Sequence, residues 1–130
     1  MTTGSPPAFD SDDVLAALEA LDDEALDRLD YGVIGFDADY AVSRYNATES
    51  RLAAMQRDTV LGQHVFASLA QCMNNYLVAQ RFEDAAASGA ALDATLDYVL
   101  TLRMKPTKVR LRLLAAPQAA QRYLLLRRRT

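Results

Sequence analysis

The sequence has very few of the residues that build metal centres and disulfides. Its 130 residues include one cysteine, one histidine and no tryptophan. A single cysteine excludes an internal disulfide, and one Cys with one His does not supply the clustered ligands of a zinc or haem site. A glycine-rich phosphate loop is also missing. We therefore predict no metal site, and any chemistry of the thiol must come from its own sulfur.

Long hydrophobic runs are missing as well. No apolar stretch approaches the roughly 20 residues of a membrane-spanning helix, and the first residues have no charged and apolar signal sequence. Hydrophobic residues still make up 51% of the chain, which is enough to bury one core. We expect a single-domain, cytoplasmic protein that does not bind membranes.

The charges are unevenly distributed along the chain. Residues 1–30 hold nine carboxylates and one arginine, whereas residues 103–130 hold nine cations and no acid. Most of these cations alternate with apolar residues, as on the solvent face of a strand, so nucleic-acid binding is not favoured. We expect the acidic N-terminal segment to lie across a basic sheet, held partly by screened electrostatic attraction.

Hydrophobic periodicity predicts an α+β fold with one antiparallel sheet. The 3.6-residue period indicates one or two helices from a cap at Asp10 or Ser11 to about residue 29, several short helical turns between 46 and 69, and a longer helix from an Asn74-Asn75 cap to Gly89. Alternation or apolar runs indicate strands. These expected strands cover residues 31–36, 41–45, 95–102, 109–113 and 123–126.

Three side chains form a candidate ligand site. Cys72 ends an apolar stretch. Tyr45 precedes it by 27 residues, and Glu49 follows Tyr45 by four residues. A thiol can carry an acyl group, and a phenol and a carboxyl can hydrogen-bond the far end of that group. Structural roles are open for each: Cys72 and Tyr45 as core residues, and Glu49 as the last residue of a capping box that starts at Asn46.

Five motifs together resemble a known family. The segments YNATE at 45–49, VLG at 60–62, Cys72, ASG at 87–89 and MKPTKV at 104–109 occur in the order and spacing of the photoactive yellow protein family. The similarity runs from about Phe9 to Arg129. It implies a PAS fold, with a central five-stranded antiparallel sheet flanked by helices. The implied division is an N-terminal helical cap over residues 1–29 and a PAS core over residues 30–130.

The resemblance also implies a pigment. In the family, p-coumaric acid (4-hydroxycinnamic acid) is attached as a thioester to the residue that matches Cys72. Tyr45 and Glu49 match the pair that hydrogen-bonds the phenolic oxygen, and Met104 matches a methionine beside the pigment that assists thermal recovery. A phenol titrates near ~10, so a phenolate at neutral pH needs such donors, and Glu49 can donate only if burial keeps it neutral.

The chain departs from the family pattern near the pigment. Ala53 and Met55 stand where the family usually has a threonine that supports the tyrosine and an arginine that covers the pigment. Arg51 or Arg57 is a candidate replacement for that arginine. We count Ala53 and Met55 among the expected pigment-binding positions.

The function implied is that of a blue-light photoreceptor, not an enzyme. It would signal through isomerisation, proton transfer from Glu49 and partial unfolding of the N-terminal cap, acting on an unknown downstream protein as a monomer or weak dimer. Two alternatives are a PAS sensor or interaction module without pigment, and a thiol enzyme that pairs Cys72 with His64, for which no orienting acid or oxyanion loop is apparent.

Overall fold

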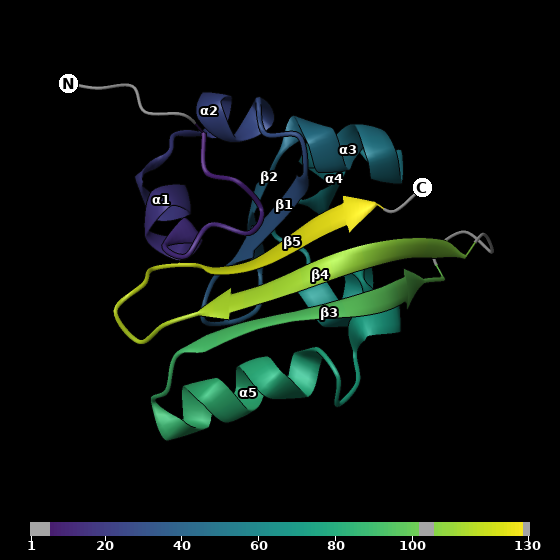
Figure 1. Cartoon of the computed structure of the whole chain (residues 1–130). Coiled ribbons are helices and arrows are strands. Elements are labelled where there is room, and N and C mark those ends of the chain that lie inside the picture. The colour runs from purple at the N-terminus through teal and green to yellow at the C-terminus, as the bar shows by residue number, and fades with distance from the viewer. Residues whose placement is uncertain (1–5, 102–105, 129–130) are drawn as a thin grey trace.

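The computed structural model describes residues 6–101 and 106–128 and has an α+β fold (Figure 1). One antiparallel sheet has the strand order β2-β1-β5-β4-β3, which confirms the predicted fold class. The strands are β1 (Gly32–Phe36), β2 (Val42–Tyr45), β3 (Leu92–Leu100), β4 (Thr107–Ala115) and β5 (Arg122–Arg128).

Short helices fill the chain before and between the strands. In order they are α1 (Val14–Ala20), α2 (Asp23–Asp27), α3 (Ala47–Ala53), α4 (Arg57–Val60), the π-helical turn η1 (Val65–Leu69), the 3₁₀ turn η2 (Gln71–Met73) and α5 (Ala79–Ser88). Helices α1 and α2 come first in the chain and lie away from α5, which runs beside β3 (Figure 1). No helix in the described part of the chain is long and apolar enough to cross a membrane.

Two of the expected helix caps lie elsewhere. The α1 helix begins at Val14, with Asp13 at its N-cap, and no side chain caps it. The hydroxyl of Ser11, one of the two expected caps, instead accepts from the Ala8 N–H. Asn75 does accept from the Leu77 and Val78 N–H groups, but α5 starts at Ala79, with Val78 at its N-cap. At the other end Gly89, with φ +68°, closes α5 as predicted.

The sheet separates two apolar clusters, and β5 contributes to both because its side chains alternate. Leu124 and Leu126 pack into what we call the helix-side core, with Phe66 of η1 and Phe82 of α5. The cap-side core contains ten buried residues of the cap and the sheet. They are Phe9, Val14, Leu18, Leu26, Leu29, Tyr31, Val33, Leu114, Tyr123 and Leu125.

The N-terminal segment is tied to the sheet by arginine side chains. Arg112 donates to the Phe9 and Ser11 carbonyls at 2.8 and 2.7 Å, and Arg44 donates to those of Leu18 and Leu21 at 2.9 and 2.6 Å. Much of the expected electrostatic attraction is therefore directional bonding to main-chain oxygens.

The acidic residues of this segment do form ion pairs, but not mainly with the basic C-terminal end. Asp10 lies 3.8 Å from Arg127. Asp23 and Asp27 instead pair with arginines from the middle of the chain, Arg44 at 3.3 Å and Arg57 at 2.6 Å.

Candidate functional site

Cys72 lies in η2 and is half-buried against the helix-side core. The turn that carries it is fixed by its own carbonyl oxygen, which accepts from the Tyr98 hydroxyl at 2.5 Å and from the Asn75 side-chain amide at 3.2 Å. The Asn75 amide also donates to the Tyr98 hydroxyl at 2.7 Å. Strand β3 thus holds the thiol-bearing turn in place while the thiol keeps partial access to solvent.

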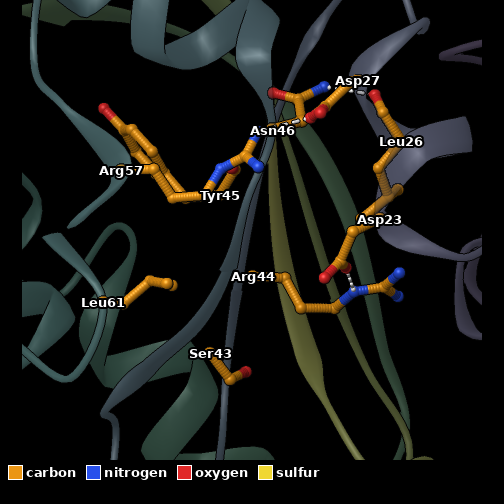
Figure 2. A pocket seen from close by; sticks show the side chains of 9 residues that line it. All are labelled: Asp23, Leu26, Asp27, Ser43, Arg44, Tyr45, Asn46, Arg57 and Leu61. Carbon is orange, nitrogen blue, oxygen red and sulfur yellow. Dashed lines mark hydrogen bonds and ion pairs between the residues drawn. The ribbon is translucent and has the colours of Figure 1, made fainter.

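Tyr45 is the last residue of β2 and is buried in the same helix-side core, with 3% of its surface exposed. Its carbonyl accepts from the Arg57 Nε at 2.8 Å, and Figure 2 draws the side chains of both residues. Tyr45 and Cys72 therefore contact one apolar cluster from separate elements.

Glu49 lies in the first turn of α3 and is 2% exposed. Both of its carboxylate oxygens are bound by the Arg128 guanidinium, Oε1 to Nη1 at 2.5 Å and Oε2 to Nη2 at 3.2 Å. Gly32 of β1 makes room for this carboxyl, because a Cβ atom there would lie 2.0 Å from Oε1. The carboxyl is therefore packed against β1 and paired with β5.

The capping box at the start of α3 is only half formed. The Asn46 side chain accepts from the Glu49 N–H at 3.0 Å, but the Asn46 N–H donates to the Val33 carbonyl instead of to Glu49. The alternative that the Glu49 carboxyl caps its own helix is therefore wrong. Asn46 also donates to the Leu26 and Tyr31 carbonyls, which connects α3 to the cap.

Burial and the arginine act in opposite directions on Glu49. Removal from water raises its pKa above the usual value, while the hydrogen bonds and the positive charge of Arg128 lower it, and burial has the larger effect. The charge of this carboxyl is consequently sensitive to any change in its hydrogen-bond partners.

The remaining predicted site residues have mixed outcomes. Ala53 ends α3 and is half-buried, and Met55 is partly buried against the helix-side core. Met104 lies outside the described residues. Arg51 is exposed, and Arg57 binds Asp27 and the Tyr45 carbonyl.

The cavity in Figure 2 belongs to the junction of cap and core rather than to Cys72. It has a volume of about 30 Å³, room for little more than water. Side chains of α2, β2 and α4 line it together with Asn46, the N-cap residue of α3, and the Asp23 carboxylate faces Arg44 (Figure 2).

His64 has a structural role that does not involve Cys72. Its Nδ1 accepts from the Phe66 and Ala67 N–H groups at 3.1 and 3.0 Å and so caps η1. Its ring also stacks on Tyr40, with ring centroids 5.6 Å apart. This arrangement gives no support to a Cys72-His64 nucleophilic pair.

Sequence reasoning missed three residues that shape the site: Gly32, Tyr98 and Arg128. The alternation of β5 could have indicated Arg128, because it shares the face of Leu124 and Leu126. Nothing local could have indicated its partner, since Glu49 lies 79 residues away.

Comparison with known proteins identifies the family. No protein-family model matches the chain. The photoactive yellow protein of Halochromatium salexigens is 34% identical over 102 residues, covering 78% of this chain and 81% of that protein. That of Rhodothalassium salexigens is 32% identical over the same length. The chain belongs to the photoactive yellow protein family.

Structural similarity agrees with this assignment. The photoactive yellow protein domain of the sensor histidine kinase Ppr from Rhodospirillum centenum superposes with a TM-score of 0.79 and 31% identity, over 87% of this chain and 98% of that domain. The PAS domain of nitrogen regulation protein NR(II) from Vibrio parahaemolyticus, at 15% identity and a TM-score of 0.56, shares the PAS fold. As a member of the photoactive yellow protein family, the chain belongs with photoreceptors and not with enzymes.

Proposed function

We propose that this chain is a cytoplasmic blue-light photoreceptor that carries p-coumaric acid as a thioester on Cys72. The observation that carries the proposal is the grouping of a half-buried thiol with a buried phenol and a buried carboxyl beside one face of the sheet, in a member of this family. A thioester forms when the thiol sulfur bonds to the acyl carbon of an activated acid and the leaving group departs with the thiol proton.

The residues present fit the proposed pigment. Cys72 supplies the attachment atom from a turn held by Tyr98, and Tyr45 and Glu49 supply two hydrogen-bonding groups screened from water. Gly32 supports this fit because it leaves space for the Glu49 carboxyl that any larger residue would fill. When bound, the pigment would supply a double bond that isomerises in light and a phenol whose proton affinity then changes.

Glu49 would serve as the proton source. A neutral carboxyl can donate a hydrogen bond, and burial favours the neutral form. Once its proton is given away, Glu49 is a carboxylate that is screened from water. A buried carboxylate requires a new partner or a rearrangement of its surroundings.

The first turn of α3 connects this charge change to the N-terminal cap. In the same turn as Glu49, Thr48 donates to the Leu29 carbonyl at 2.5 Å and the Ala47 N–H donates to Asp27 at 2.8 Å. A shift of this turn would loosen the end of the cap. We propose that release of residues 1–29 from the core of residues 30–130 is the signal read by a downstream protein.

Intact mass and absorbance test the proposal. The full chain is treated with activated p-coumaric acid and digested, and one hydroxycinnamoyl group is expected on the Cys72 peptide, together with visible absorbance that Cys72→Ala lacks. Loaded material without visible absorbance would contradict the photoreceptor, and failure of the group to attach to Cys72 would favour a PAS sensor without pigment.

A second test is Glu49→Gln. This variant should suppress the light-induced hydrogen exchange of amides in the cap while the pigment stays attached.

A further inference from the structure

Arg128 holds a position that the proposed proton transfer does not use. It ends β5 with its side chain on the same face as Leu124 and Leu126 of the helix-side core, whereas the preceding residue Arg127 faces the cap and lies over the Phe9 ring. Its side chain is 18% exposed, and that of Glu49 is 3% exposed. The pair is thus largely shielded from water on the side of the sheet where Tyr45 and Cys72 lie.

The geometry of the pair is that of a strong ionic contact. Two nitrogens of one planar guanidinium reach two oxygens of one carboxylate, at 2.5 and 3.2 Å. Gly32 lets the carboxyl lie against β1 within reach of Arg128. Because arginine does not lose its proton in proteins, this contact favours the ionised form of Glu49.

We propose that Arg128 is a positioning residue that acts as the counter-ion of Glu49 and controls whether its carboxyl holds a proton. Glu49 can donate a hydrogen bond only when it is neutral, so it must leave the guanidinium to serve a phenolic oxygen. After it has given its proton away, it returns to Arg128. This second part rests on the proposed function, whereas the pairing itself does not.

The consequence is that the carboxylate formed in light would not be left without a partner. A buried carboxylate with no counter-charge is strongly destabilising, and a bidentate arginine removes much of that penalty. Arg128 would therefore stabilise the signalling state and slow its return to the dark state.

The pairing is tested on the full chain without added pigment. Infrared difference spectra at neutral pH between the chain and Glu49→Gln give the signal of this carboxyl alone. In Arg128→Gln the C=O band of a protonated Glu49 is expected to increase at the expense of its carboxylate band, because burial then acts without opposition. Arg127→Gln is the matched control, with the same charge removed from the other face of β5, and should leave the Glu49 bands unchanged.

A conservative variant covers the case in which Arg128→Gln does not fold. Arg128→Lys keeps the positive charge without the fork, so the protonated fraction should lie between that of the chain and the fully neutral carboxyl. Glu49 bands that are the same in the chain, in Arg128→Lys and in any folded Arg128→Gln would overturn the proposal.

A second measurement uses chain loaded with p-coumaric acid. Arg128→Gln is expected to recover from the light state about tenfold faster than the loaded chain, and Arg127→Gln less than twofold faster. Unchanged recovery in Arg128→Gln would overturn the role in light. If no pigment attaches, the proposed function fails while the infrared result still decides the pairing.

Discussion

The helix-side core and the cap-side core occupy opposite faces of one sheet but are held by different contacts. Among the described residues, the helix-side core has twenty buried apolar members and the cap-side core has ten. The smaller cluster is supplemented by bonds from arginine and asparagine side chains to carbonyls of the N-terminal segment. Apolar contact is not directional, whereas these bonds fail together when the geometry shifts, so the cap side is the one suited to release.

On the face of the sheet that carries the helix-side core, the described residues also include a largely buried ion pair. Glu49 and Arg128 depend on each other, because either one alone would be a buried charge without a partner. The larger core is thus accompanied by one sensitive ion pair, whereas the smaller core is held by several directional hydrogen bonds.

The largest effect is expected from Gly32→Ala on the helix-side face. The added methyl would lie 2.0 Å from Glu49 Oε1, so the carboxyl must move and its pairing with Arg128 is weakened. We expect a loss of about 3 kcal/mol in the free energy of unfolding, measured by urea denaturation. Gly35→Ala is the control, since its methyl meets side-chain atoms at 3.0 to 3.1 Å that can shift slightly. Equal losses in the two variants would contradict the tight packing of Glu49.

Arg112→Met should affect the cap side by a smaller amount. Methionine keeps most of the buried volume but leaves the Phe9 and Ser11 carbonyls without their donor and Asp93 without its pair. We expect a loss of about 2 kcal/mol, seen as faster amide exchange in residues 9–27 with the amides of β4 and β5 little changed. Arg110→Met is the control, because Arg110 pairs with an exposed Asp97 of β3 at 3.3 Å and, among the described residues, donates to no carbonyl of the cap. A uniform increase in exchange over the whole chain would show that the cap is not a separate unit.

Sequence reasoning succeeded where side-chain alternation or a local signal decides the structure. Residues 109–113 and 123–126 lie within observed strands, and Gly89 closes α5. The predicted strand at 123–126 is too short, because the arginines that follow it end the apolar run from which the strand is predicted. Arg127 and Arg128 in fact extend β5, and each finds its partner on a different face.

The site could be predicted only in part for the same physical reason. Cys72, Tyr45 and Glu49 were found through chemistry and resemblance to a family. The contacts that position them, from Tyr98 to the Cys72 carbonyl and from Arg128 to Glu49, join residues 26 and 79 positions apart. Such contacts depend on strand order and register, which no local pattern contains.

Alkaline pH should weaken the cap side through Tyr31. Its hydroxyl donates to the Pro7 carbonyl at 2.8 Å, and burial raises its pKa to about 12. The unfolded chain loses this proton near ~10, so the contribution of Tyr31 is complete below that pH and is lost as pH rises toward 12. Between pH 9 and 11 we expect the chain to lose about 1 kcal/mol more stability than Tyr31→Phe. The two pH profiles would be parallel if Tyr31 ionised equally easily in both states.

The smallest effect is expected from Asp27→Asn, and its salt dependence sharpens the comparison. Arg57 pairs with Asp27 at 2.6 Å, and both side chains are about one third exposed, so the pair is worth only about 0.5 kcal/mol. Salt screens exposed charges but not buried bonds to carbonyls. Asp27→Asn keeps an oxygen for the Ala47 N–H and leaves the bond from Arg57 to the Tyr45 carbonyl in place. Its effect should therefore largely vanish in 1 M salt, whereas that of Arg112→Met should persist. If both effects vanished, screened attraction would dominate the attachment of the cap, as the charge asymmetry of the chain first indicated. If only the Asp27→Asn effect vanishes, directional bonds to main-chain oxygens are what hold the cap in place.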